Sequence, residues 1–428
     1  MKRQYKRIAT LATSATARDT YVLFIGNLVS AFFSFLFTLL IARGLSVSDF
    51  GVFSAAVNLV TIIASLSDLG ISSGLISFIA KASRKGDVLK AQKYMKASLV
   101  VRLIALSVLV LITVLFAPFI SNSFLATRDA TVAYWVGGLS LAFLFWALFP
   151  SILQAQKRFL QSVVVDLSLA GGRLLLAFGF FMLGGLTLTK AFVAFTLSTF
   201  FVILAGFAFL GTSFLLVRVE KDVYSKLLRF SGWLGVNRVI SSVSGRLDVQ
   251  MLAAMAGATM TGFYSISSRL AMFIVLLTSS FSAVLAPRLA SFGNKESEKT
   301  YIKKASLAIV PVIFGVILWI AIAEPFIAIL FGQKYLPSVP VFRALAASMI
   351  PFLLTAPAVP AIIYAMKKPI YIGVFSFFQI FTVFIINLIL IPKIGVYAPT
   401  VAFGLVNTIL AVYVWTIVIR YYRTSPKT

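Results

Sequence analysis

Cysteine and histidine are both absent from this 428-residue chain, and its 12 acidic residues are far outnumbered by 38 basic ones. The absence of cysteine excludes disulfide bonds and thiolate chemistry. The absence of histidine removes the most common metal ligand and the side chain that most readily carries protons near neutral pH. We therefore expect no metal site and no cofactor, and any ion-linked chemistry must depend on the few carboxylates.

Charged residues of either sign are also scarce. They make up 12% of the chain, against about 25% in soluble domains. Hydrophobic residues reach 60%, and the mean hydropathy is +1.02. A net charge of +26 would suit a nucleic-acid partner, but the basic residues lie in short segments between long apolar runs. The composition predicts a multi-pass membrane protein in contact with lipids, with no nucleic acid as partner.

The apolar runs are long enough to cross a bilayer, and we expect all of them to be helices, because an open sheet edge cannot satisfy its hydrogen bonds in lipid. They lie near residues 21–42, 50–80, 97–120, 132–154, 160–183, 189–217, 230–254, 262–287, 305–331, 341–365, 370–391 and 397–420. The predicted fold class is therefore all-α: a polytopic membrane protein with twelve transmembrane helices.

The two halves of the chain share short words in the same order. FGVFSAA at 50–56 resembles TGFYSIS at 261–267, and KASL occurs at both 96–99 and 304–307. Six spans is an even number, so both halves enter the membrane from the same side and the repeat is parallel. We predict two six-helix lobes related by this pseudo-repeat, 1–217 and 218–428, with a polar connector at 218–229.

Lysine and arginine fall mainly in alternate loops, on one side of the predicted membrane. The basic leader MKRQYKR belongs to that side, and the apolar run after it is too long for a removed signal peptide. By the positive-inside rule this side is cytoplasmic, so both termini are expected in the cytoplasm. The opposite side carries few basic residues: Arg43, Arg128, Lys190, Lys334 and Lys393.

The seventh apolar run combines hydrophobic residues with arginines. At 100° per residue, one face of a helix through this run carries Ser231, Gly235, Arg238, Ser242 and Arg246. An arginine near the bilayer centre costs at least about 2.5–3.5 kcal/mol unless it meets water or a partner. We therefore predict that this face lines a wet, positively charged cavity inside the helix bundle.

Charged residues occur inside other spans as well. The predicted substrate-binding residues of the cavity are Arg173, Arg238, Arg246 and Arg269. Arg102 and Arg343 lie nearer the ends of their helices, and we expect them to extend toward the membrane surface. The ion-coupling candidates are Asp68, Asp166 and Asp248, which either carry a coupling proton or sodium ion or pair with the arginines.

Two spans are predicted to bend. The second is longer than a bilayer requires and contains Asp68-Leu69-Gly70, so it either bends there or projects beyond the cytoplasmic surface. The tenth contains Pro351, Pro357 and Pro360, each of which lacks a backbone N–H and can kink a helix. A hinge for rocking bundles and an ordinary proline kink are both open interpretations of the tenth span.

Four stretches resemble those of a known family. They are IARGLSVSDFGVFSAA at 41–56, SLSDLGISSGL at 65–75, ILQAQKRF at 152–159 and NLILIPKIGVYAPTVA at 387–402. The chain resembles the bacterial oligosaccharide flippases of the Wzx type, within the larger group of multidrug, oligosaccharidyl-lipid and polysaccharide exporters. In the last stretch Ala398-Pro399 stands where the family usually has Gly-Ala.

The resemblance implies two lobes around a central cationic cavity and transport by alternating access. It implies that a polyprenyl-pyrophosphate-linked glycan, such as an O-antigen unit, moves from the cytoplasmic to the outer leaflet of a bacterial cytoplasmic membrane, with polysaccharide-assembly proteins as further partners. The chemistry of the predicted cavity is consistent with such a substrate, because the planar arginine fork donates two hydrogen bonds to a phosphate at once.

Three other functions compete with the oligosaccharide flippase. A lipid-linked peptidoglycan-precursor flippase usually has two further helices, for which this length leaves no room. A multidrug or cation antiporter of the same superfamily would need acidic residues in its cavity, yet the span at 21–42 contains none and the excess charge is positive. A membrane glycan polymerase or ligase would need a catalytic external loop. The longest external connection, 121–131, contains only Arg128 and Asp129 as charged residues. We therefore predict a transporter and not an enzyme.

Overall fold

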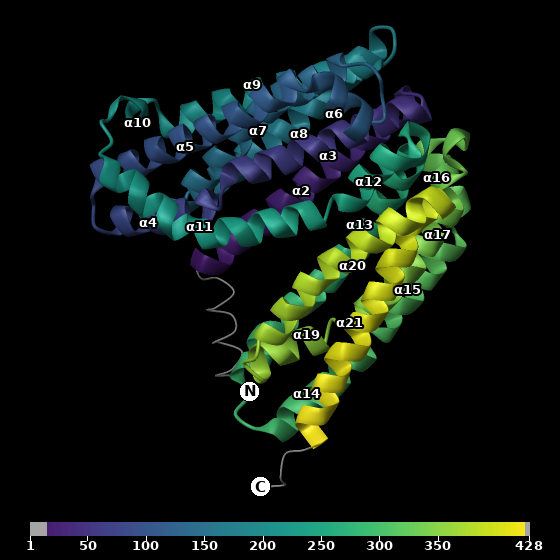
Figure 1. Ribbon diagram of the computed structural model, residues 1–428. Coiled ribbons are helices and arrows are strands. Elements are labelled where there is room, and N and C mark those ends of the chain that lie inside the picture. The colour runs from purple at the N-terminus through teal and green to yellow at the C-terminus, as the bar shows by residue number, and fades with distance from the viewer. Residues whose placement is uncertain (1–14, 424–428) are drawn as a thin grey trace. The chain divides into compact units, whose positions relative to one another are not determined.

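The computed structural model describes residues 15–423, and every regular element within that range is a helix (Figure 1). By their internal contacts the residues divide into two compact units, Met1–Arg246 and Leu247–Thr428. We call these unit 1 and unit 2 and describe each one separately.

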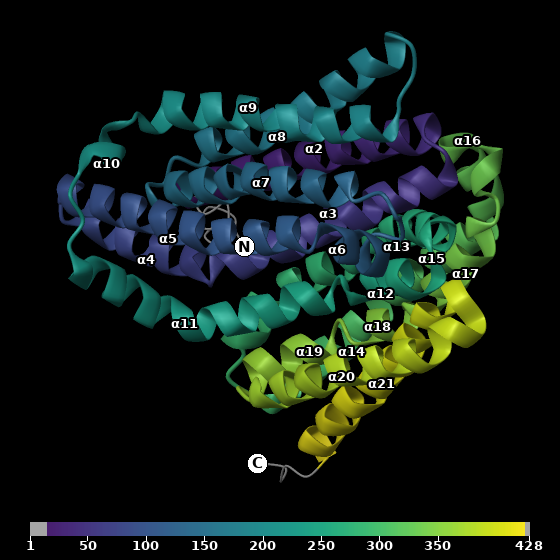
Figure 2. The same cartoon turned by 45° about the horizontal axis from the view of Figure 1, so that its top comes forward.

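Unit 1 is a bundle around α7 (Thr131–Ala155), the most buried of the candidate spans. This helix is apolar on all sides, as expected for a helix surrounded by others, and it contacts α3, α4, α5, α8 and α9. In Figures 1 and 2, α9 and α11 border the unit on opposite sides. The remaining helices are α2 (Ala15–Gly44), α3 (Val47–Asp68), α4 (Ile71–Arg84), α5 (Val88–Leu115), α6 (Ala117–Phe124), α8 (Phe159–Met182), α9 (Leu188–Leu210), α10 (Ser213–Leu216) and α11 (Lys221–Ser244).

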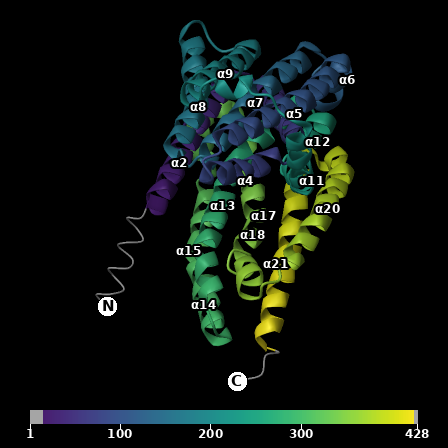
Figure 3. The same ribbon diagram turned by 90° about the vertical axis from the view of Figure 1, so that its left-hand side faces the viewer.

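Unit 2 contains long helices and several short, broken ones, which Figure 3 shows as an elongated group. The long helices are α13 (Ala258–Ser291), α20 (Ile370–Ile394) and α21 (Ala398–Arg423). The shorter ones are α12 (Leu247–Ala256), α14 (Lys295–Ala308), α15 (Val310–Ala321), α16 (Ala323–Phe331), α17 (Ser338–Ser348), α18 (Ile350–Leu354) and α19 (Ala358–Pro360), with 3₁₀ turns η1 (Gln333–Tyr335) and η3 (Gly395–Tyr397) and a π turn η2 (Ala361–Ala365). The buried helix α17 contacts α13, α15, α16 and α21.

The predicted fold class is confirmed. In the described part of the chain, 10 continuous helical segments are long and apolar enough to cross a membrane. One of these, Ile370–Arg423, contains both α20 and α21 and is 54 residues long. When α20 and α21 are counted as two spans and the more polar α11–α12 segment is added, the total agrees with the twelve expected spans.

Both predicted bends are present. The second span is divided into α3 and α4 by Leu69 and Gly70, which adopt left-handed backbone angles of φ 47° and 73°. The tenth span is divided into α17, α18, α19 and η2, with Pro351 at the start of α18 and Pro357 just before α19. A proline at a helix start has no intrahelical hydrogen bond to lose. The hinge function of these prolines stays a prediction.

Two details of the seventh span were predicted wrongly. Helix α11 begins at Lys221, inside the expected connector 218–229, and it ends at Ser244. The Arg246 amide bonds to the Val243 carbonyl in a tight turn, and α12 begins at Leu247. Arg246 therefore lies in the turn between α11 and α12, and the helical-wheel argument that extended one face past residue 244 does not apply to it.

The contact boundary between the units lies after Arg246, because α11 packs against α3, α4 and α5 of unit 1. The sequence repeat instead places α11 at the start of the second half. Packing in one structure and ancestry of a repeat are different properties, so the division into six-helix lobes at 217/218 stays a prediction.

Candidate functional site

Helix α11 crosses the bend between α3 and α4 so closely that the two backbones are in contact. A Cβ atom added to Gly70 would lie 2.7 Å from both the Gly235 Cα and the Ser231 carbonyl oxygen. A Cβ atom added to Gly235 would lie 2.6 Å from the Leu69 carbonyl carbon. Small residues permit such close helix approach in membranes, where packing and not hydrophobic burial drives association. The contact continues one turn further, where Gly74 lies against the Ser231 hydroxyl.

Hydrogen bonds extend this contact toward the C-terminal end of α11. The hydroxyls of Ser65 and Ser242 share a hydrogen bond of 2.6 Å. Asn58 donates its side-chain amide to the Arg246 carbonyl at 2.9 Å, and Arg246 Nη1 donates to Asn58 Oδ1 at 3.4 Å. Partner numbers therefore fall along α4–α3 as they rise along α11, so the helices are antiparallel. We call this contact the α11 seam.

The α11 seam corrects the expected position of this helix face. The helical wheel placed Ser231, Gly235, Ser242 and Arg246 on one side, and the structure keeps the first three there. That side is not a wet cavity wall in this structure, because the residues pack against α3 and α4 and Ser231 is fully buried. The helical period shows which residues share a face, but it does not show what covers the face.

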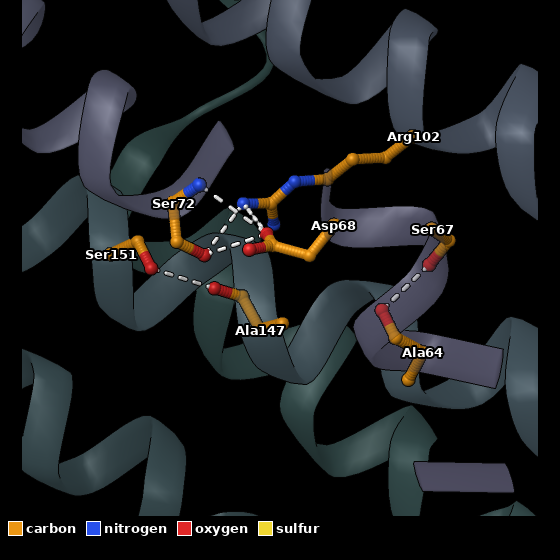
Figure 4. Close-up of polar contacts among 7 residues, drawn as sticks. All are labelled: Ala64, Ser67, Asp68, Ser72, Arg102, Ala147 and Ser151. Carbon is orange, nitrogen blue, oxygen red and sulfur yellow. Dashed lines mark hydrogen bonds and ion pairs between the residues drawn. The ribbon is translucent and has the colours of Figure 1, made fainter. Parts of the chain in front are cut away.

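A buried ion pair lies at the same bend (Figure 4). Arg102 Nη2 of α5 lies 2.5 Å from Asp68 Oδ1, and the two side chains are 1% and 6% exposed. Ser72 joins them: its hydroxyl donates to Asp68 Oδ1 and accepts from Arg102 Nη2, both at 2.8 Å. The Ser72 amide also donates to Asp68 at 3.3 Å. A buried charge of either sign is tolerated when a counter-charge and additional hydrogen bonds surround it.

The position of Arg102 shows that the prediction of a surface-reaching side chain was wrong. From α5 it points at the bend between α3 and α4, within the unit, where Asp68 at the end of α3 supplies the counter-charge. Arg343 agrees better with its expected position: it is 43% exposed and donates to the Ile320 carbonyl at 3.2 Å. Of the ion-coupling candidates, Asp68 thus pairs with an arginine, although not with one of the predicted cavity residues.

The other candidate residues of unit 1 lie apart from one another in their described contacts. Arg173 of α8 is half-buried, with its guanidinium carbon 4.2 Å from the ring centroid of Phe195 and 5.9 Å from that of Phe143. Such stacking stabilises a cation over an aromatic face. Asp166, also half-buried on α8, accepts a hydrogen bond at its backbone carbonyl from Ser30. The side chain of Arg238 lies outside the described residues.

In unit 2, Asp248 is buried in the first turn of α12 and accepts a hydrogen bond of 2.5 Å from the hydroxyl of Tyr264 on α13. Tyr264 is fully buried. Arg269 lies half-buried further along α13.

Comparison with known proteins identifies the family. A family model described as "Polysaccharide biosynthesis protein" matches residues 16–293, well over half of the chain. The chain belongs to the polysaccharide biosynthesis protein family. This family member is 23% identical over 427 residues to the probable low-salt glycan biosynthesis flippase Agl15 of Haloferax volcanii, covering 92% of this chain and 82% of the relative. The bacterial O-antigen type stays a prediction.

Solved structures establish that this polysaccharide biosynthesis protein shares a known fold. The lipid II flippase MurJ in an inward closed conformation matches with a TM-score of 0.74 and 14% identity, over 93% of this chain and 87% of MurJ. An inward-facing multidrug resistance MATE family transporter of the MOP superfamily matches with a TM-score of 0.72 and 16% identity, over 93% and 96% of the two chains. The protein is therefore a multi-pass membrane protein with the MATE- and MurJ-like architecture.

Sequence reasoning missed the partners of α11 and of Asp68 in this family member. Asn58, Ser65 and Ser72 were not assigned a function, and Arg102 was placed at the surface. One signal could have revealed the α11 seam: Gly70 and Gly74 are four residues apart, as are Ser231 and Gly235. Paired small residues at this spacing are typical of close helix crossings in membranes.

The segment between α9 and α11 is attached to α5. Lys93 forms an ion pair of 2.5 Å with Glu220, and Lys96 donates to the Val217 carbonyl at 2.8 Å. Gln92 donates to the Ser213 hydroxyl at 2.9 Å. The hydrogen bond from Lys93 holds the pKa of the exposed Glu220 carboxyl below its ordinary value of 4.5. The chain that leads into α11 is thus tied to the helix that carries Arg102.

Proposed function

We propose that this protein is a flippase that moves a polyprenyl-pyrophosphate-linked oligosaccharide from the cytoplasmic to the outer leaflet of the cytoplasmic membrane by alternating access. The observation that carries the proposal is the match to the polysaccharide biosynthesis family together with similarity over 92% of the chain to a probable glycan biosynthesis flippase. Both termini are proposed to lie in the cytoplasm. Bacterial O-antigen units are one class of such substrates, and the archaeal relative extends the class to other glycans.

The proposed binding residues are Arg173, Arg238, Arg246 and Arg269, acting on the pyrophosphate. In the present structure Arg246 is engaged with Asn58 at the α11 seam. We therefore propose that the transport cycle separates α11 from α3 and α4, which would free this arginine for the substrate. The Asp68–Arg102 pair keeps its place on unit 1 during that movement, because both of its members belong to the bundle that α11 leaves.

The proposed coupling residues are Asp248 and Asp166, with Asp68 a weaker candidate. Asp68 is paired with the buried Arg102, and a carboxylate held by such a partner exchanges a proton or a sodium ion less easily. Asp248 accepts a hydrogen bond from Tyr264. Ionisable residues inside membrane spans commonly mark proton and ion pathways. Replacing Asp248 with Asn should leave the protein level unchanged and remove the dependence of transport on an ion gradient.

A cation antiporter is the second candidate function, because a MATE transporter shares the fold. Its support is weaker, because an identity of 16% shows only that the fold is shared. The net charge of this chain is also +26. A cationic substrate would be repelled by the proposed binding arginines. A glycan polymerase or ligase has no supporting observation in the described residues.

Reconstituted protein would test the flippase. Proteoliposomes would contain a lipid-linked oligosaccharide with a fluorophore on the glycan, and an impermeant quencher would report arrival at the outer leaflet. We expect Arg246→Ala and Arg269→Ala to slow translocation by roughly ten- to a hundred-fold, the effect of losing one charge-assisted contact. Arg343→Ala, which removes an exposed intramembrane arginine outside the proposed set, is the matched control. Equal rates in all variants would refute the arginine assignment, and no translocation by the native protein would refute the flippase.

A further inference from the structure

An open groove of about 520 Å³ lies between α14 and α21 of unit 2, and none of the residues that line it belongs to the proposed transport mechanism. Helix α14 contributes Lys299, Ile302, Lys303 and Ser306, which follow the i, i+3, i+4, i+7 spacing of a single helix face. Helix α21 contributes Trp415, Val418, Ile419, Tyr422 and Arg423 with the same kind of spacing. Among the described residues that line the groove none is acidic.

The groove is basic at one end and apolar at the other. The hydroxyl of Tyr422 donates to Glu298 at 2.7 Å, so the end of α21 meets the beginning of α14. Lys299 and Arg423 lie beside that junction. Ser306 and Trp415 lie seven or eight residues from it, roughly 10–12 Å along the helices at 1.5 Å per residue. Charge therefore lies where both helices emerge from the apolar region, and carbon surface lies deeper.

The walls of the groove are held by contacts that leave its cations available. Glu298 is buried and takes the Tyr422 hydrogen bond, and the Trp415 indole donates to the Leu354 carbonyl at 2.9 Å. Lys299, Lys303 and Arg423 are exposed. The outer surface nearby is apolar and exposed, including Leu307 and Ile419, as expected for a face in contact with lipid.

We propose that this groove binds one anionic phospholipid of the surrounding leaflet. The phosphate lies among Lys299, Lys303 and Arg423, and an acyl chain lies along Ile302, Ile419 and Trp415. The polarity of the groove has the same direction as that of a lipid, whose charged head lies at the membrane surface and whose chain lies within it. Basic pockets between helices at a membrane surface recognise anionic head groups in this way.

Native mass spectrometry of the purified protein would test the site. The probes are phosphatidylglycerol and phosphatidylcholine with identical acyl chains. We expect Lys299→Gln, Lys303→Gln and Arg423→Gln together to weaken phosphatidylglycerol binding by roughly ten- to a hundred-fold. Lys81→Gln, Arg84→Gln and Lys85→Gln remove the same charge from exposed positions around the end of α4 and should change it by less than about two-fold. Ile419→Trp keeps every charge but narrows the groove, and it should also weaken binding.

Three results would overturn the proposal. Equal loss of phosphatidylglycerol binding in the groove and control variants would mean that binding depends on net charge alone. Equal binding of phosphatidylcholine would exclude recognition of the anionic head group. Binding of a polyprenyl phosphate with displacement of phosphatidylglycerol would assign the groove to the transported lipid. None of these measurements depends on translocation, so the groove and the flippase proposal can fail separately.

Discussion

Gly70 and Gly235 lie backbone against backbone, where α11 crosses the bend that separates α3 from α4. Gly70 has φ 73°, a left-handed conformation that L residues rarely adopt, and neither glycine has space for a Cβ atom. The sequence neighbour Asp68 forms the buried pair with Arg102. One bend thus carries both the closest helix approach in the α11 seam and the buried ion pair of unit 1.

Substitution of Gly235 tests this crossing. Gly235→Leu should displace α11 from α3 and α4, because its side chain would meet the Leu69 carbonyl. The readout is a disulfide between cysteines placed at positions 65 and 242, whose native hydroxyls are 2.6 Å apart. We expect several-fold less cross-linking in the Leu variant. Gly232→Leu is the control on the same helix, since nothing lies within 4 Å of that glycine. Equal cross-linking in both variants would contradict the crossing.

Cross-linking also tests whether α11 must move. The native chain contains no cysteine, so the Ser65→Cys, Ser242→Cys protein has a single pair of thiols. Oxidation should stop glycan translocation nearly completely if α11 leaves α3 during transport, and a reductant should restore it. The two single-cysteine proteins, treated identically, control for oxidation of other groups. Full translocation by the cross-linked protein would show that the seam stays closed throughout the cycle.

Removal of Arg102 should destabilise the protein strongly. Arg102→Ala leaves the buried Asp68 carboxylate without its main counter-charge, at a cost of about 3–5 kcal/mol. Arg102→Met combined with Asp68→Asn removes both charges and should recover a large part of that loss. Arg343→Ala removes a half-exposed arginine and should cost less than about 1 kcal/mol. The measurement is unfolding in detergent. A neutral effect of Arg102→Ala would refute the importance of the pair.

The ion pair between Lys93 and Glu220 predicts a pH dependence of the segment before α11. Folding lowers the pKa of the Glu220 carboxyl. Its ion pair therefore stabilises the folded segment above the unfolded pKa of 4.5, and this stabilisation is lost as the pH falls through the folded pKa. A spin label on a cysteine at position 219 should therefore become more mobile as the pH falls below 4.5 and through the lower folded pKa of Glu220. In the Glu220→Gln variant the same spin label should be mobile at every pH. If the label on the chain with Glu220 kept the same mobility at acidic pH, that result would contradict the attachment of this segment to α5.

Composition alone was sufficient to recognise a membrane protein. With 12% charged residues and long apolar runs, helices are the structures that satisfy the backbone in lipid. Local chemistry was also sufficient to predict the bend at Asp68-Leu69-Gly70 and the breaks at the prolines of the tenth span. These features depend on backbone preferences of residues close together in the chain, which is why they could be read without a structure.

Tertiary structure decided what the polar faces contact. The helical period correctly grouped Ser231, Gly235 and Ser242, but packing against α3 and α4 made that face a close helix contact instead of a cavity wall. Arg102 is buried because Asp68, 34 positions earlier in the chain, supplies a counter-charge. A charge near the end of an apolar run has the same sequence signature whether it reaches the membrane surface or a buried partner, and the free energy of the two states differs only through contacts between distant residues.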